Sequence, residues 1–253
     1  MKKTVSSILL ASALLLGAIA PVTANAATTG TGTTDSTVHF TKPNENVTPV
    51  DPNNPGTTVD PSNPGGNGGT TPSGDLTFLY VSDSIDFGSA DTPIKSQTSG
   101  TTQTIKNGNK NADGSTNVVT VGNTAFSTNT NLISEVSDTR GTNAGWTVQV
   151  NSSALTDTKV GDLKGATLDL DGSAATVKNS AVLDGSTIDK ANTTALATDG
   201  TPGTIYSAKT GNGAGVTTMQ LDPANVTLTV PTNVATGTYV GKLNWTLSDT
   251  PGA

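Results

Sequence analysis

Cysteine is absent from this 253-residue chain, and histidine and arginine each occur once, as His39 and Arg140. Without cysteine the chain can form neither disulfides nor thiolate zinc sites, and it has no thiolate nucleophile. A single histidine excludes a multi-histidine metal site and argues against a Ser-His-Asp triad. The stability of the folded part must therefore come from its core.

Aromatic residues make up only 4% of the chain, so we expect a core built mainly from Val, Leu, Ile and Ala. No segment repeats apolar residues at helical spacing over three turns, so no long amphipathic helix is expected. Beyond residue 20 there is no apolar run of membrane-spanning length and no L-P-x-T-G sorting motif. We therefore expect that any attachment of the mature chain to a cell is non-covalent and does not involve membrane insertion.

The first 26 residues have the pattern of a secretion signal peptide. Two lysines precede an apolar run at residues 8–20, and an A-x-A box predicts cleavage between Ala26 and Ala27. Removing both lysines leaves 11 basic residues (13 − 2) against 20 acidic ones, a formal charge of −9. Such an acidic chain has no electrostatic basis for binding nucleic acid or anionic lipid. The expected localisation is secreted.

Residues 27–74 are rich in Pro, Gly and Thr and contain an imperfect repeat, V-D-P-N-N-P-G at 50–56 and V-D-P-S-N-P-G at 59–65. This composition predicts a disordered or extended linker, and deleting it should leave thermal unfolding of the domain nearly unchanged. Proline-rich tracts can also be ligands of aromatic grooves, but no P-x-x-P run with basic flanks is present. The short apolar island around His39 could pair as a strand.

From residue 75 to 253 the sequence predicts one antiparallel β-sandwich or Greek-key-like domain. The expected strands are short, rich in Val, Ile, Thr and aromatics, and separated by Gly, Asn, Asp and Pro turns. They cover 76–81, 85–88, 117–121, 132–136, 145–150, 166–170, 204–207, 217–221, 225–230 and 238–247.

The two tryptophans lie in the most distinctive of these strands. Alternation places Trp146, Val148 and Val150 on one face of the first strand, and Tyr239, Gly241, Leu243, Trp245 and Leu247 on one face of the last, which Pro251 follows. The other face of the last strand is almost entirely polar. Each tryptophan could be a core residue or a platform on which a sugar ring stacks.

The pattern W-x-L-x-x-x-P, formed by Trp245, Leu247 and Pro251, resembles the WxL domain of Gram-positive surface proteins. The stretch Val136–Thr142 followed by Gly145 and Trp146 resembles the first motif of that domain, with Val148 in place of the usual leucine. This resemblance implies that residues 74–253 hold the protein to cell-wall peptidoglycan without catalysis or a cofactor. It equally implies, as an alternative, a subunit of a surface complex with other WxL proteins, a membrane-anchored WxL-interacting partner or host ligands.

Asp138 and Arg140 form the most chemically specific pair. Their side chains lie two residues apart on the same side, so they could close a turn as an ion pair. Alternatively, Arg140 could hold a carboxylate of a peptide stem through both guanidinium nitrogens.

Two further readings are disfavoured. The stretch beginning at Asp169 starts like a calcium loop, but Ala174 and Ser180 stand where glycine and a bidentate Glu are required, so no metal is expected. A glycosidase needs paired carboxylates, and only Glu135 lies in an apolar strand. We therefore expect no enzymatic activity.

Overall fold

The computed structural model describes residues 32–44, 48–59, 73–90, 102–111, 113–182, 185–191, 193–197 and 200–252. The chain divides into two units, residues 1–40 and 41–253. In the first unit the described residues 32–40 form no strand, and Val38 and Phe40 are exposed. The expected secretion signal, with Ala26 and Ala27, lies outside the described residues.

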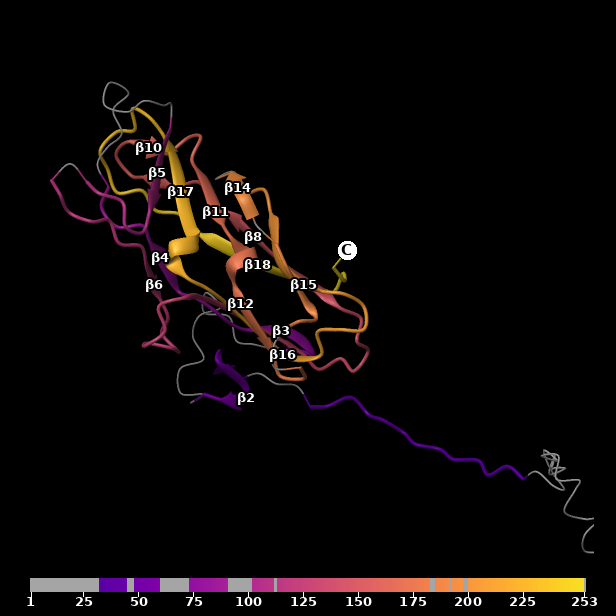
Figure 1. Ribbon diagram of the computed structural model, residues 1–253. Coiled ribbons are helices and arrows are strands. Elements are labelled where there is room, and N and C mark those ends of the chain that lie inside the picture. The colour runs from indigo at the N-terminus through magenta and orange to yellow at the C-terminus, as the bar shows by residue number, and fades with distance from the viewer. Residues whose placement is uncertain are drawn as a thin grey trace, which may run out of the picture. The chain divides into compact units, whose positions relative to one another are not determined.

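The second unit contains three four-stranded antiparallel sheets (Figure 1). The first sheet has the order β12-β16-β7-β3. Its strands are β12 (Thr176–Asn179), β16 (Gly215–Leu221), β7 (Leu132–Asp138) and β3 (Leu76–Val81). Every residue of β7 is buried, so both faces of this central strand are covered.

The second sheet has the order β13-β15-β8-β18 and carries both tryptophans. Its strands are β13 (Ile188–Lys190), β15 (Gly203–Ala208), β8 (Trp146–Ser152) and β18 (Leu243–Ser248). Along β8, buried residues alternate with half-buried ones, as a strand with one core face and one outer face requires.

The third sheet has the order β14-β11-β17-β5, formed by β14 (Thr193–Ala197), β11 (Thr167–Leu170), β17 (Val226–Pro231) and β5 (Thr102–Lys106). Three two-stranded ribbons complete the described strands: β1 (Val50–Asp51) with β2 (Asn54–Thr58), β4 (Ser84–Asp86) with β6 (Thr120–Gly122), and β9 (Thr156–Asp157) with β10 (Gly161–Asp162). The helical elements of the described residues are two 3-10 turns, Gly172–Ala174 and Pro223–Asn225.

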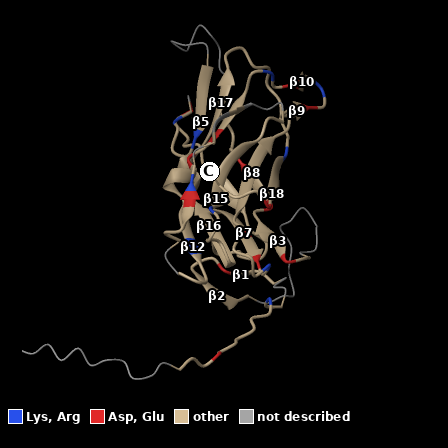
Figure 2. Ribbon diagram, turned by 90° about the vertical axis from the view of Figure 1, so that its right-hand side faces the viewer, with Lys and Arg blue, Asp and Glu red and all other residues tan. Residues whose placement is uncertain are grey.

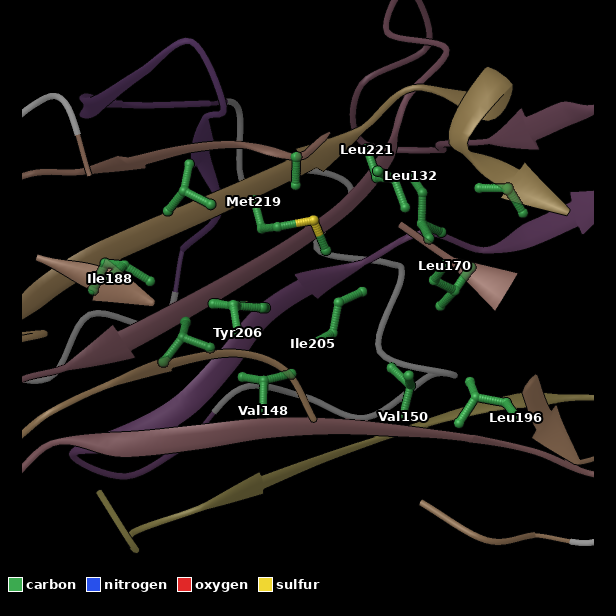
Figure 3. Close-up of a cluster of buried hydrophobic side chains, with 14 of the residues drawn as sticks. Leu132, Val148, Val150, Leu170, Ile188, Leu196, Ile205, Tyr206, Met219 and Leu221 are labelled. Carbon is green, nitrogen blue, oxygen red and sulfur yellow. The ribbon is translucent and has the colours of Figure 1, made fainter. Parts of the chain in front are cut away.

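The main core lies where the sheets face one another. Val148 and Val150 of β8 enter the same cluster as Met219 and Leu221 of β16, and Leu170 of β11 joins them (Figure 3). All five side chains are at most 1% exposed. Hydrophobic burial contributes about 25 cal/mol per Å² of apolar surface, so this cluster is the main stabilising element of a chain without disulfides.

The all-β fold expected from the sequence is confirmed, and most expected strands are present with shifted ends. The last one is shorter than expected, because β18 begins at Leu243. Upstream of it, Val240 makes only an isolated bridge to Thr156. The strands β5, β12, β13 and β14 were not expected, since their sequences are largely polar or small and gain their apolar contacts only from neighbouring sheets.

The structure differs from the sequence-based expectation within the presumed linker. Residues 50–58 form the β1–β2 hairpin, and Val50, Pro52 and Pro55 are buried against the outer side of the first sheet. The hairpin could not be predicted from pattern and composition, because within residues 50–58 only these three side chains are buried. The boundaries 27–74 and 75–253 themselves stay predictions.

Candidate functional site

Trp146 begins β8 and is completely buried. Its indole N–H donates to the carbonyl oxygen of Gly213 over 3.0 Å. Its ring meets that of Tyr206 edge-to-face, with the centroids 5.5 Å apart. Gly213 has a φ of 83°, and a Cβ there would lie 2.5 Å from the indole nitrogen. The close approach therefore requires glycine at this position, and the buried ring cannot stack on a ligand.

Tyr206 extends this buried polar contact toward the first sheet. Its hydroxyl lies 2.8 Å from the hydroxyl of Ser134 on β7. Burial raises the pKa of Tyr206 well above its usual value, since the phenolate would have to form without water. The phenol therefore stays neutral and links the two sheets through a hydrogen bond.

Asp138 and Arg140 form the closed turn that was one of the two alternatives. The guanidinium donates from Nε to Oδ1 over 3.0 Å and from Nη2 to Oδ2 over 2.8 Å. Nη2 also donates to the carbonyl oxygen of Gly145 over 2.7 Å, directly before Trp146. The hydrogen bonds to Asp138 raise the pKa of Arg140. With both nitrogens engaged, Arg140 fixes the connection between β7 and β8.

The second tryptophan motif lies beside the first one. Strand β18 pairs antiparallel with β8, and the register places Trp245 opposite Val150 and Leu247 opposite Val148. Trp245 and Leu247 are only half-buried, because β18 is the edge of the sheet. They pack against the margin of the main core.

The two indoles do not pack against each other. Trp245 lies opposite Val150, four residues along β8 from Trp146. Four residues of a strand span about 13 Å, so the rings cannot meet. The sequence fixes the face of each side chain but not this register.

Tyr239 and Pro251 lie on either side of β18. Tyr239 is half-buried, and its hydroxyl donates to the carbonyl oxygen of Ala235 over 2.9 Å. Pro251 is exposed in a tail that crosses the start of β8. Thr147 Oγ1 donates to the carbonyl oxygen of Thr250 over 2.8 Å, and Gly252 N donates to that of Ala208 over 3.0 Å. Pro251 thus stands where the chain leaves β18 and reaches β15.

The outward-facing side chains of β8 and β18 are all uncharged, and we call this set the polar face. It consists of three cross-strand pairs, namely Ser248 with Thr147, Thr246 with Gln149 and Asn244 with Asn151. Asn244 and Thr246 are exposed and the other four are half-buried. Figure 2 shows both strands free of charged residues.

The polar face was not among the candidate residues chosen from the sequence. The sequence feature that could have identified it is the polar residue at every second position of the last strand. Hydroxyl and amide groups both donate and accept hydrogen bonds. Thr147, Asn151 and Ser248 already bond within the chain. The exposed Asn244 and Thr246 are therefore the members of the polar face that can bind a neutral polyhydroxylated ligand, while Trp146 stays buried and Trp245 packs at the core margin.

Glu135, the acid in an apolar strand, is fully buried. Burial raises its pKa to about 8, against the opposing hydrogen bond from the Val50 amide. Asp51 raises it further by charge repulsion. Because substrate cannot reach it, Glu135 does not have the setting of a glycosidase acid.

In the described residues, acids and histidine form no group of three that could hold a metal ion. The stretch after Asp169 runs from β11 into the 3-10 turn Gly172–Ala174. No helix in the described residues is long and apolar enough to span a bilayer.

Comparison with known proteins gives one match. The model of the WxL domain, a surface domain that binds cell walls, matches residues 27–251. No curated protein and no solved structure matches the chain. The match begins upstream of β3 and takes in the β1–β2 hairpin as well as both tryptophan strands. The chain therefore belongs to the WxL domain family of cell wall-binding surface domains.

Proposed function

We propose that the protein attaches non-covalently to the peptidoglycan of the cell wall through the polar face of β8 and β18. The observation that supports this proposal is that the inward-facing and outward-facing residues of β8 and β18 differ in kind. Trp146 is buried and Trp245 packs at the core margin. The residues that alternate with the inward-facing ones along β8 and β18 point outward and carry uncharged hydrogen-bonding groups. Glycan strands present hydroxyl and acetamido groups, which such side chains can bind.

In this proposal the protein is secreted and non-catalytic. Among the acids in the described part of the chain, the one whose pKa is raised into the range of a general acid is Glu135, which is buried beneath the β1–β2 hairpin. Asp138 and Arg140 act by fixing the turn that leads into β8. Membership of a surface complex is compatible with the same wall attachment.

The test removes the exposed part of the polar face. Asn244→Ala together with Thr246→Ala should weaken binding to purified peptidoglycan about 5- to 30-fold, since each lost hydrogen bond contributes about 1 kcal/mol. The matched control is Thr102→Ala with Thr104→Ala, which are exposed on β5 in another sheet. Sedimentation with wall fragments measures both variants.

Equal binding by both double variants would refute the assignment of the polar face. A second measurement tests the mode of attachment. Wall-bound protein should be released by denaturant or salt without muramidase, and release by muramidase alone would show covalent attachment. Released reducing sugar would contradict the non-catalytic assignment.

A further inference from the structure

The β1–β2 hairpin covers the outer side of the first sheet with three apolar side chains. Val50 packs with Leu79 of β3 and Val216 of β16. Pro52 and Pro55 are buried as well, whereas Asn53, Asn54 and residues 56–58 are exposed. The hairpin is thus anchored at three positions spaced over six residues.

Polar contacts to the hairpin go mostly to its backbone. Val50 N donates to Glu135 Oε2 over 3.1 Å. The carbonyl oxygen of Pro52 accepts from Thr218 Oγ1 over 3.0 Å and from Gln220 Nε2 over 3.2 Å. Lys178 Nζ donates to the carbonyl oxygen of Asn53 over 2.5 Å.

One further hydrogen bond involves a side chain of the hairpin: Gln220 Nε2 donates to Asn53 Oδ1 over 3.2 Å. The face formed by Glu135, Lys178, Thr218 and Gln220 therefore recognises a backbone shape and three apolar anchors. Main-chain hydrogen bonds for affinity and pockets for a few side chains are also what bind short peptides at sheet edges.

The chain contains this peptide twice. Residues 59–65 repeat residues 50–56 with a single change, Ser62 for Asn53. All three anchors recur, as Val59, Pro61 and Pro64. In the present arrangement Val59 packs beside Phe126 at the end of the hairpin, so an exchange would move it into the place of Val50. The turn residue recurs too, since Asp51 Oδ1 accepts from Asn53 N over 2.8 Å and Asp60 stands at the equivalent position.

We propose that the outer face of β7 and β16 is a peptide-binding site for V-D-P-x-N-P-G, and that the second repeat, residues 59–65, is its alternative ligand. Exchange of the first repeat for the second shifts the chain by nine residues. It lengthens the segment preceding the domain by roughly 30 Å when extended. The site would thus set how far that segment reaches from the wall-bound domain.

The first repeat is the stronger of the two ligands. Asn54 Nδ2 donates to Thr57 Oγ1 over 2.9 Å within the hairpin, whereas the residue equivalent to Thr57 in the second repeat is Gly66. Glycine supplies no hydroxyl and weakens a strand. The second repeat also lacks the Asn53 side chain that Gln220 binds. It therefore fills the site when the first repeat is displaced.

A double-mutant cycle in the full mature chain tests this assignment. Val50→Asp places a charge beside buried Glu135 and displaces the first repeat. Pro61→Ser removes an anchor of the second repeat. We expect Pro61→Ser to leave the melting temperature of the otherwise wild-type chain unchanged. In the Val50→Asp background it should lower the melting temperature further, by about 3–6 °C.

Pro43→Ser, at an exposed proline outside both repeats, is the matched control and should add nothing in either background. A fluorescent peptide of residues 57–68 should bind the Val50→Asp/Pro61→Ser protein, and the same peptide with Val59→Asp should not bind. Strict additivity in the cycle, or no binding by the unmodified peptide, would overturn the proposal. A dimer of the Val50→Asp protein that disappears with Pro61→Ser would also overturn it, because the second repeat would then occupy a neighbouring copy.

Discussion

Replacing Glu135 by glutamine should remove a pH dependence of stability that the wild-type protein shows. In the folded chain the carboxyl group is fully buried, and burial raises its pKa from 4.5 to about 8. The unfolded chain loses this proton near pH 4.5, whereas the folded chain retains it to about pH 8. The folded state thus binds more protons in this window, and its stability falls as the pH rises from about 5 to about 8.

The magnitude follows from the size of the shift. One pKa unit corresponds to about 1.4 kcal/mol, so the wild-type protein should lose roughly 4–5 kcal/mol across the window and little more above it. Glutamine keeps the size and the acceptor for Val50 N but cannot ionise. The free energy of unfolding of Glu135→Gln should therefore be nearly flat between pH 5 and 8.

Urea unfolding of both proteins at half-unit steps of pH measures this difference. The lowered pKa values of Asp113 and Asp157 do not interfere, because hydrogen bonds to these carboxylates contribute stability that is lost only as the pH falls below about 4. Asp51→Asn is the matched control, since removing this charge should lower the pKa of folded Glu135, so that the decline ends at a lower pH and is smaller. A Glu135→Gln protein with the wild-type slope would refute the reasoning.

Three further predictions concern packing. Trp146→Ala should destabilise the domain by about 3–5 kcal/mol, and Trp245→Ala by clearly less because that ring lies half-buried on an edge strand; equal melting temperatures would contradict this. Arg140→Ala should cost about 3 kcal/mol in urea unfolding because it leaves the buried carboxylate of its partner unpaired, with Arg140→Lys intermediate. Deleting residues 27–47 should leave the melting temperature unchanged, whereas deleting 27–59 should lower it, since only the longer deletion removes the buried anchors of the hairpin.

Alternation and turn composition by themselves determined the β class and the face that each residue of the tryptophan strands presents, and they offered the turn between Asp138 and Arg140 as one of two alternatives. These properties depend on residues close together in the chain, where side-chain direction follows from the backbone period of two. The polar half of the same alternation already contained Asn244 and Thr246 as outward-facing residues.

Only the tertiary structure decided which strands are neighbours and in which register. Trp245 faces Val150 because β18 pairs with β8 at that offset, and no local pattern encodes the offset. The β1–β2 hairpin was hidden for the same reason. Its composition is that of a linker, and it acquires structure only because β7 and β16, far away in the sequence, supply the contacts that bury Val50 and bind its backbone.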